Sequence, residues 1–148
     1  MDLQFTIKAF DTLSVSELYQ LLRLRESVFI IEQNCIYQDL DNKDQKALHV
    51  IGAYNGKIVA HSRLFKAGDY FEWASIGRVV IDQEYRDRKW GYPLMEASIA
   101  GISKYFSDNK IMISAQLYLQ RFYENNGFRA ISDVYLEDDI PHIRMVRG

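Results

Sequence analysis

The chain has little of several features that mark specialised protein classes. Cys35 is its only cysteine, so no internal disulfide can form. The longest notable apolar run, Val28–Ile31, is far shorter than the roughly 18 residues that a membrane-spanning helix needs. The first residues lack the basic and apolar regions of an export signal. We therefore expect a cytoplasmic protein that does not insert into a membrane.

Charge of one sign is not in excess either. The chain carries 18 Lys and Arg against 20 Asp and Glu, which gives a formal net charge of -2. A general nucleic-acid binder needs a basic face that displaces counterions from the phosphate backbone. The mixed signs along this chain argue against such a face, so we expect no nucleic-acid partner.

What the sequence does contain is typical of a globular domain. Its 148 residues are 48% apolar and 26% charged. A chain of this length buries roughly two thirds of the surface that it exposes when unfolded. No repeat, low-complexity tract or Pro/Ser-rich linker interrupts it. We therefore expect one domain over residues 1–148.

Hydrophobic periodicity predicts an alternating series of strands and helices in the order β-α-β-β-β-α-β-α-β-β. The expected strands are Leu3–Phe10, Leu48–Tyr54, Lys57–Phe65, Trp73–Ile81, Lys110–Ala115, Phe128–Tyr135 and His142–Val146. The expected helices are Val15–Ile31, a second from near Gly91 to about Phe106, and Leu117–Asn126. This order predicts a mixed α/β fold with helices packed on the faces of a sheet.

Short-range signals support several of these elements. Asn55-Gly56 between two β-prone segments is a strong hairpin signal. Ser14 followed by Glu17 fits a capping box at the start of the first helix. Gly127 stands where the last helix would end in a left-handed residue.

The most informative segment is the charged turn before the second helix. Pro93 is tolerated only in the first turn of a helix, so the helix must begin within a residue or two of Gly91. The amides of residues 88–92 would then lack intrahelical partners and lie at the positive end of the helix dipole, beside three cationic side chains. Such a place attracts phosphate, although a solvated surface turn would look the same in sequence.

This turn resembles the pyrophosphate-binding motif of the GNAT superfamily of N-acetyltransferases, Q/R-x-x-G-x-G/A. Arg86 stands at the first position of the motif and Gly91 at the last, while Lys89 replaces the middle glycine. A second block, Gln116–Phe128, resembles the pattern N-x-x-A-x-x-x-Y-x-x-x-G-F, with Tyr123 and the closing Gly-Phe matching outright.

Within the superfamily the chain most resembles the ElaA-like branch. The resemblance rests on Arg25–Phe29, Glu32–Cys35, Tyr37–Asp39, Ile76–Val79, Lys89 and Ile140–Ile143. It implies a mixed, mostly antiparallel sheet that splays between its fourth and fifth strands, with helices on both faces.

The resemblance also implies that acetyl-CoA is the co-substrate. Backbone groups of Val79, Val80 and Ile81 would pair with the pantetheine arm, and Gln116 would contact it from the other side. The pyrophosphate would lie on the turn formed by Arg86, Asp87, Arg88, Lys89, Trp90, Gly91 and Tyr92.

For the chemistry, the resemblance points to Tyr123 as the general acid that gives the departing thiolate a proton. An amide of the splayed strand, such as that of Val80, is the natural donor to the oxyanion. The alternative for Tyr123 is a packed core aromatic.

The acceptor amine must lose a proton before it attacks. A lysine-like amine with pKa near 10.4 costs about 4.6 kcal/mol to deprotonate at pH 7, and an α-amine near 7.8 only about 1. Candidate bases are Glu32, at the end of the first helix, and His142, whose ordinary pKa suits the task. For His49 and His61 we expect structural roles.

Other residues leave alternatives open. The acidic loop with Asp39, Asp41 and Asp44 could attract a cationic acceptor or merely solubilise the surface, and it lacks the glycine and glutamate of a calcium loop. Cys35 has no adjacent base in sequence, which disfavours a covalent acyl-enzyme. We expect no metal.

The leading hypothesis is direct transfer of acetyl from acetyl-CoA to a primary amine of a small molecule or peptide in a ternary complex. The alternatives are a non-catalytic acyl-CoA sensor or scaffold and, through Arg25–Phe29, acyl-homoserine-lactone synthesis. The sequence leaves a homodimer open and does not identify the acceptor.

Overall fold

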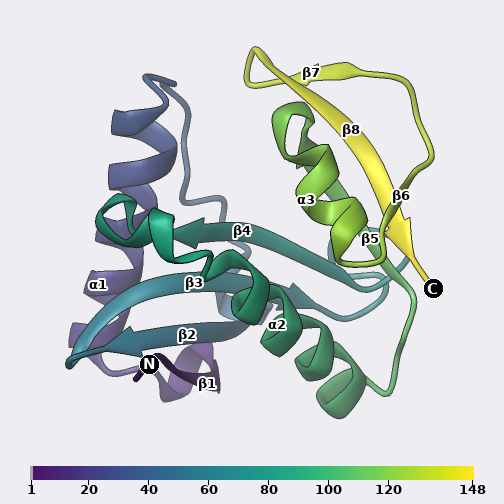
Figure 1. Cartoon of the computed structure of the whole chain (residues 1–148). Helices are drawn as coiled ribbons and strands as arrows, with labels where there is room; N and C mark the ends of the chain where they lie inside the picture. Colours follow the sequence, from purple (N-terminus) through teal and green to yellow (C-terminus); the bar gives the residue numbers. More distant parts are fainter. Residues whose placement is uncertain (1) are drawn as a thin grey trace.

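The computed structural model describes residues 2–148 (Figure 1). The helices are α1 (Val15–Arg25), α2 (Gly91–Phe106) and α3 (Gln120–Asn125). The strands are β1 (Gln4–Ala9), β2 (Leu48–Tyr54), β3 (Lys57–Phe65), β4 (Ser75–Ile81), β5 (Ile111–Gln116), β6 (Arg129–Ala130), β7 (Tyr135–Glu137) and β8 (Ile140–Arg147). None of the helices in this part of the chain has both the length and the apolar character needed to span a membrane.

The strands form two antiparallel sheets. The first has the order β1-β2-β3-β4, and the second has the order β5-β8-β6 with β7 also paired to β8. Asn55 (φ 50°) and Gly56 (φ 75°) join β2 to β3, and both central residues of this turn lie in the left-handed region. Two positive φ values are what a type I′ hairpin turn requires, so the Asn-Gly prediction is confirmed.

The two sheets meet where β4 and β5 begin, and then separate. Ala74 and Ile111 form an isolated parallel bridge, and the Met112 amide donates to the Ala74 carbonyl at 2.8 Å. Beyond that point β4 pairs with β3 as far as Ile81, while β5 pairs with β8 as far as Gln116. The strands diverge toward their carboxyl ends (Figure 1), so the predicted splay is confirmed.

Helices α1 and α2 cover opposite faces of the first sheet. Successive residues of a strand point to opposite faces. Val50 packs in the cluster that contains Leu94 of α2, whereas its neighbour Ile51 packs in the cluster that contains Leu21 of α1. The larger cluster continues through α2 into β5 and β8, so α2 joins the two sheets through its side chains.

The first helix changes its hydrogen bonding part-way. The capping box is present, since Ser14 Oγ accepts from the Glu17 amide at 3.0 Å and Glu17 Oε1 accepts from the Ser14 amide at 2.8 Å. The α-helix ends at Arg25, however, and a π-helical segment follows over Glu26–Glu32. The prediction of an α-helix as far as Ile31 is therefore wrong after Arg25, where the chain is π-helical. π-helical segments are often found at functional sites.

The predicted strand Phe128–Tyr135 is wrong in its middle. Only Arg129–Ala130 and Tyr135–Glu137 are strands. Ser132 Oγ accepts from the Arg144 amide at 2.9 Å, so a side chain takes the place of a backbone acceptor opposite β8. The chain leaves the sheet there and returns as β7, which forms a hairpin with β8.

Candidate active site

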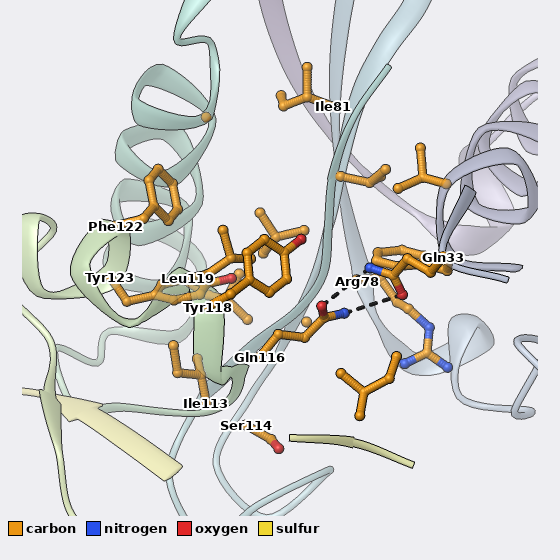
Figure 2. Close-up of a pocket in the computed structure, with 18 of the residues that line it drawn as sticks. Gln33, Arg78, Ile81, Ile113, Ser114, Gln116, Tyr118, Leu119, Phe122 and Tyr123 are labelled. Carbon is orange, nitrogen blue, oxygen red and sulfur yellow. Dashed lines mark hydrogen bonds between the residues drawn. The ribbon is translucent and has the colours of Figure 1, made fainter. Parts of the chain in front are cut away.

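A cavity of about 410 Å³ occupies the space that the diverging strands open. Its wall comes from β4, the turn before α2, β5, the start of α3 and the β7–β8 hairpin. Figure 2 shows Gln116, Tyr118 and Tyr123 facing Arg78 and Gln33 across it. Its size is within the range of small-ligand sites.

The turn before α2 forms one end of the cavity. A 3₁₀ helix runs over Gln83–Arg88, Lys89 adopts φ 57°, and α2 begins at Gly91 as Pro93 predicted. Within residues 2–148, the amides of Lys89, Trp90 and Gly91 donate to no protein acceptor. The Tyr92 amide donates to the Lys89 carbonyl at 3.3 Å, so the set of free amides is smaller than predicted.

Gly91 allows α3 to approach the start of α2. A Cβ at this position would lie 3.1 Å from the Phe122 ring. The Tyr92 ring packs against Phe122 at 5.0 Å between centroids, and the Tyr92 hydroxyl accepts from Asn125 at 3.1 Å. The phosphate-binding candidate and the helix that carries Tyr123 are therefore in direct contact.

Some residues predicted for this turn lie elsewhere. Asp87 and Arg88 are exposed and do not line the cavity in the described chain. The Arg88 guanidinium instead lies over the rings of Tyr54, Tyr85 and Trp90, at 5.2, 5.0 and 5.2 Å from their centroids. Arg88 therefore stacks on aromatic rings and does not lie beside the free amides, as the sequence predicted it would. Arg86 and Lys89 do line the cavity.

Arg86 forms an ion pair with Glu32. Both guanidinium nitrogens Nη1 and Nη2 donate to the Glu32 carboxylate, and the second of these bonds measures 2.5 Å. This hydrogen bonding lowers the pKa of the Glu32 carboxyl below its ordinary value. Glu32 also lies outside the cavity wall of the described chain, so the structure does not bring this predicted base to the cavity.

Tyr123 lies on α3 with its ring packed edge-on to Phe122 and Phe128, at 5.1 and 5.9 Å between centroids. It is 6% exposed, and its hydroxyl points toward the cavity (Figure 2). Burial raises the pKa of the phenol, with the nearby Tyr118 adding to the effect. The phenol therefore stays protonated at neutral pH and is able to donate.

The segment after Tyr123 holds this ring in place. Gly127 has φ 89° and ends α3, as predicted, with its amide donating to the Glu124 carbonyl at 3.0 Å. The Phe128 amide donates to the Tyr123 carbonyl at 3.1 Å. A left-handed glycine at this place satisfies the last carbonyls of a helix.

Gln116 and the residues predicted on β4 also line the cavity. Val79, Val80 and Ile81 form one wall, and Gln116 lies on the opposite one. Gln33 and Gln116 exchange side-chain amide hydrogen bonds of 3.2 and 3.4 Å across the gap (Figure 2). This contact ties the segment after α1 to the second sheet.

His142 lies on β8 in the wall of the cavity, and it is buried. Its Nδ1 is 2.7 Å from the Ile140 carbonyl and its Nε2 is 3.6 Å from Glu137 Oε2. Of the two predicted bases, His142 is thus the one that faces the cavity.

Sequence reasoning did not assign a role to Arg78. Opposite Ser62 of β3, β4 has two residues, Arg78 and Val79, which is a β-bulge, and Arg78 adopts φ 49°. Bulges and left-handed non-glycine residues concentrate beside functional sites. The Arg78 side chain lines the cavity, and its Nε donates to Asp39 at 2.7 Å. No pattern in the sequence indicates a bulge at this position.

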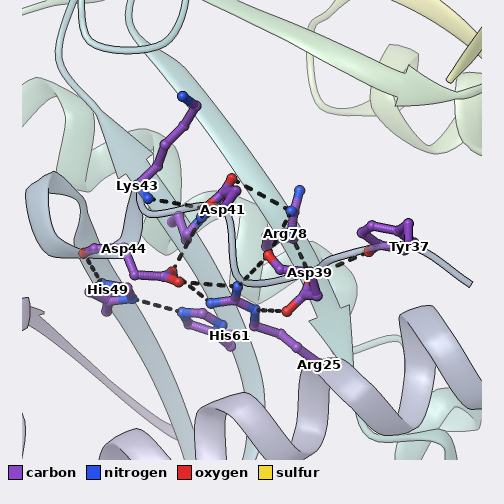
Figure 3. Close-up of polar contacts among 10 residues, drawn as sticks. Arg25, Tyr37, Asp39, Asp41, Lys43, Asp44, His49, His61 and Arg78 are labelled. Carbon is purple, nitrogen blue, oxygen red and sulfur yellow. Dashed lines mark hydrogen bonds and ion pairs between the residues drawn. The ribbon is translucent and has the colours of Figure 1, made fainter. Parts of the chain in front are cut away.

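The acidic loop does not present free charge, which corrects one prediction. Asp39 accepts from Arg25 at 2.9 Å, Asp44 accepts from Arg25 at 2.6 Å and Asp41 accepts from Arg63 at 2.8 Å (Figure 3). Three carboxylates thus face three guanidinium groups, those of Arg25, Arg63 and Arg78. Hydrogen bonds from arginine hold the pKa of Asp41 and Asp44 below the ordinary value against the effect of burial.

His49 and His61 extend this buried network, which agrees with structural roles. His49 Nε2 is 2.9 Å from the Asp44 carbonyl and must donate to it, so the neutral ring accepts at Nδ1 from His61 Nε2, 3.0 Å away. His61 Nδ1 is then buried and has no hydrogen-bond partner among residues 2–148. Burial lowers the pKa of both imidazoles, and that of His61 the more strongly.

The Cys35 thiol contacts the backbone of the turn between β7 and β8. The Cys35 thiol donates to the Asp138 carbonyl at 3.3 Å, which links the segment after α1 to the β7–β8 turn. Across residues 2–148, no three His, Cys, Asp or Glu side chains come together in a group that could hold a metal ion.

Comparisons with known proteins identify the family. Residues 15–147 match the family model described as an acetyltransferase (GNAT) domain. The chain is 42% identical to the protein ElaA of Escherichia coli over 137 residues, which cover 91% of this chain and 90% of ElaA. The chain belongs to the GNAT acetyltransferase family.

Two crystal structures agree with this assignment. Escherichia coli ElaA aligns over 99% of both chains with a TM-score of 0.91 and 38% identity. An acyl-CoA N-acyltransferase from Pseudomonas aeruginosa aligns over 98% of this chain and 99% of its own, with a TM-score of 0.90 and 38% identity. This GNAT domain therefore falls in the ElaA-like branch, and its fold is the mixed α/β fold of these neighbours.

In this GNAT domain, the family's two motifs meet at the cavity. Arg86 and Gly91 lie at its phosphate-binding end, while Gln116 and Tyr123 lie on the wall opposite β4. The family's acyltransferases use acyl-CoA, and the residues at this cavity fit such a molecule. The free amides and two cations suit a diphosphate, and the crevice between β4 and β5 suits an extended arm.

Proposed function

We propose that the protein is an acetyl-CoA-dependent N-acetyltransferase that transfers acetyl to a primary amine by direct attack in a ternary complex. One observation carries the proposal: a single cavity joins the free amides before α2 to the phenol of Tyr123 and continues to His142. An activated acyl group anchored at one end would then lie within reach of an acid and a base.

The anchoring end acts through backbone and charge. The amides of Lys89, Trp90 and Gly91 would donate to the diphosphate at the positive end of the α2 dipole. The Lys89 side chain adds a cation, and Arg86 adds a second one once it leaves Glu32. Backbone groups of Val79–Ile81 and the amide of Gln116 would hold the arm in the crevice.

The reacting end supplies a donor and an acid. Attack by an amine places negative charge on the carbonyl oxygen, and an amide of β4, such as that of Val80, would stabilise it. The C–S bond then breaks, and Tyr123 gives its phenolic proton to the departing sulfur. Burial keeps the phenol protonated until that step. Positioned proton donors of this kind contribute about 10²- to 10⁴-fold in rate.

His142 is the base that the geometry favours. Its imidazole faces the cavity, whereas the carboxylate of Glu32 is occupied by Arg86 and lies outside the wall. A neutral imidazole can accept a proton from an incoming ammonium group.

Two measurements test this function. Isothermal titration calorimetry with CoA tests the anchoring site, and thiol release from acetyl-CoA with a panel of amines and peptides tests transfer. We expect binding together with acceptor-dependent thiol release. Failure of both measurements would overturn the proposal, while CoA binding without release for every acceptor would favour an acyl-CoA sensor instead.

A further inference from the structure

The end of the cavity at His142 is built around the β7–β8 hairpin. Tyr135 pairs in register with His142, and Glu137 pairs with Ile140. The cavity wall includes Glu137, Asp138 and His142 from this hairpin and Ser114 from β5. If an acyl group is held between β4 and β5, this end is where an acceptor enters.

The protonation state of His142 follows from its contacts. A carbonyl oxygen can only accept, so Nδ1, which is 2.7 Å from the Ile140 carbonyl, must carry a proton. In the neutral ring Nε2 is then the basic nitrogen. Nε2 makes no hydrogen bond within residues 2–148, and its nearest ionisable neighbour is Glu137 Oε2 at 3.6 Å. The residue lines the cavity and is only 6% exposed.

A chain of hydroxyl groups fixes the Glu137 carboxylate. Ser114 Oγ donates to Glu137 Oε1 at 3.0 Å. Because Ser114 has one hydroxyl proton, the Tyr135 hydroxyl, 2.5 Å away, must donate to Ser114. The Tyr135 ring also stacks on His142, with 6.2 Å between centroids and 24° between planes. Strands β5, β7 and β8 therefore hold Glu137 and His142 side by side.

Glu137 and Asp138 bring two negative charges to this end of the cavity, against one positive charge on Arg144, whose guanidinium lies 6.0 Å from the centroid of the Tyr135 ring. Arg78 lines the cavity too, but Asp39 accepts from its Nε at 2.7 Å, and Asp41 lies 3.6 Å from its Nη2. Its network contains three arginines and three aspartates, so its formal charge sums to zero. Glu137 and Asp138 have no such arginine partners among residues 2–148. At the α2 turn Arg86 is paired with Glu32, and Lys89 adds a positive charge, so this part of the cavity differs in sign from the hairpin.

We propose that Glu137 and His142 form a proton-accepting pair for an acceptor that carries a second positive charge, such as a diamine or polyamine. This inference deepens the proposed function and rests on it. Glu137 and Asp138 attract the dication, and His142 Nε2 takes one proton from the attacking ammonium group. Glu137 is a positioning residue, since it acts by stabilising the imidazolium that forms.

The steps balance in protons and bonds. His142 takes the first proton and passes it to solvent, which leaves a neutral amine. The C–N bond forms, the C–S bond breaks, and Tyr123 gives its proton to the sulfur. The second proton of the nitrogen, lost from the tetrahedral intermediate, restores the Tyr123 phenol through water. The products are the amide, CoA as a thiol and one released proton.

The pH dependence of His142 reflects every charged group around it. Strand β5, packed alongside, contributes Gln116 and Ser114, which do not titrate. The ionisable neighbours are Glu137 and Tyr135 on β7, Asp138 in the turn, Arg144 on β8, and Arg78 and Tyr37 on the opposite wall. Among these, only Glu137 lies close to Nε2, so we expect it to have the largest effect.

The first test is the pH profile of kcat/KM. We expect the wild-type rate to rise with pH as His142 loses its proton. Glu137→Gln should move this rise to lower pH by roughly half a unit to one unit, because the imidazolium loses its anionic neighbour. Ser114→Ala should move it in the same direction by less. Glu96→Gln, which removes an exposed carboxylate from α2, is the matched control and should leave the profile unchanged.

The second test uses acceptors that differ only in charge at the far end: putrescine, butylamine and γ-aminobutyrate. We expect kcat/KM to fall in that order, by roughly five- to tenfold at each step. Glu137→Gln and Asp138→Asn should each reduce the preference for putrescine through KM rather than kcat. No preference for the dication, or an unchanged pH profile in Glu137→Gln, would overturn the proposal.

The outcomes separate this inference from the proposed function. If wild-type protein binds CoA and acetylates butylamine and γ-aminobutyrate as well as putrescine, transfer stands and the dication preference fails. If it neither binds CoA nor releases thiol with any acceptor, the proposed function fails first. Circular dichroism of each variant shows whether a lost rate reflects the site or a lost fold.

Discussion

Glu32, at the end of the π-helical segment, holds the guanidinium of Arg86 in the turn before α2. The arginine that stands at the first position of the family's phosphate motif is thus paired with a carboxylate of the same chain. A diphosphate would have to displace that carboxylate to reach it.

Removing this competitor should tighten cofactor binding. In Glu32→Gln, we expect CoA to bind roughly two- to fivefold more tightly, because an exposed ion pair of about 0.2–1 kcal/mol no longer has to be broken. Titration calorimetry gives the dissociation constants. Glu26→Gln removes a charge from the same helical segment without touching Arg86 and serves as the control. Equal affinities of the two variants would contradict the competition.

Tyr123→Phe should separate binding from chemistry. The ring keeps its packing against Phe122 and Phe128, so we expect unchanged CoA affinity and an unchanged melting temperature. The turnover number should fall by roughly 10²- to 10⁴-fold, because no phenol protonates the leaving sulfur. Tyr19→Phe removes the hydroxyl of an exposed tyrosine on α1 and serves as the control, which should keep full activity. A Tyr123→Phe enzyme with full activity would remove the phenol from the mechanism.

Lys89 is a non-glycine residue at φ 57°, in the position where the family motif has glycine. We expect Lys89→Gly to raise the free energy of unfolding by about 0.5–1 kcal/mol, since the left-handed strain exceeds the extra entropy of an unfolded glycine. Lys89→Ala keeps the strain and removes the same charge. Urea unfolding compares the two variants, and equal stabilities would show that the turn relaxes without strain. Both should bind CoA more weakly at low salt.

The stability of the protein should fall in mildly acidic solution. The folded state lowers the pKa of His49 and His61 below 6.5, so below pH 6.5 the unfolded chain binds protons that the folded chain excludes. We expect the free energy of unfolding to drop by about 1–3 kcal/mol between pH 7.5 and 5.5. Carboxylates do not contribute in this window, because their ordinary pKa values lie near 4.

His61→Gln provides the control for that slope. A glutamine amide can donate to His49 Nδ1 as the imidazole does, but it does not titrate. Whatever its overall stability, this variant should lose less stability than the wild type over the same pH range. An identical slope in the two proteins would place the acid sensitivity elsewhere.

Much of the fold was predictable because its signals are local. Asn55-Gly56 requires two left-handed residues, and Ser14 with Glu17 caps a helix through neighbours three residues apart. Pro93 fixes the start of α2 through covalent geometry. Each of these features depends on the residues of one short segment.

The features that were missed depend on distant partners or on small differences in period. Asp41 meets Arg63, 22 residues away, so its neutralisation cannot be recognised within the acidic loop. Over the seven residues of Glu26–Glu32, an apolar stripe does not distinguish a π-helix from an α-helix. At Ser132 the side-chain hydroxyl, in place of a backbone group, accepts a hydrogen bond from an amide of β8. No local sequence pattern indicates this contact.

The candidate site shows the same division. Tyr123, Gln116 and Gly91 were found through the family's motifs, and all three line the cavity. Glu137 lies in an acidic turn that reads as solvated charge, and only pairing across the hairpin places it beside His142. The pairing of Glu32 was missed for the same reason, since its partner Arg86 is 54 residues away.

The bridge between Ala74 and Ile111 joins the two sheets at one end of the gap between β4 and β5. Within residues 2–148, no ladder of backbone hydrogen bonds joins β4 to β5 beyond that junction, so the two strands can move apart there without breaking a strand pair. The width of the gap is then set by the packing of α2 against both sheets and by side-chain hydrogen bonds, among them Gln33 with Gln116 and Cys35 with Asp138. The gap that admits a thioester is therefore adjustable by substitutions far from the reacting atoms.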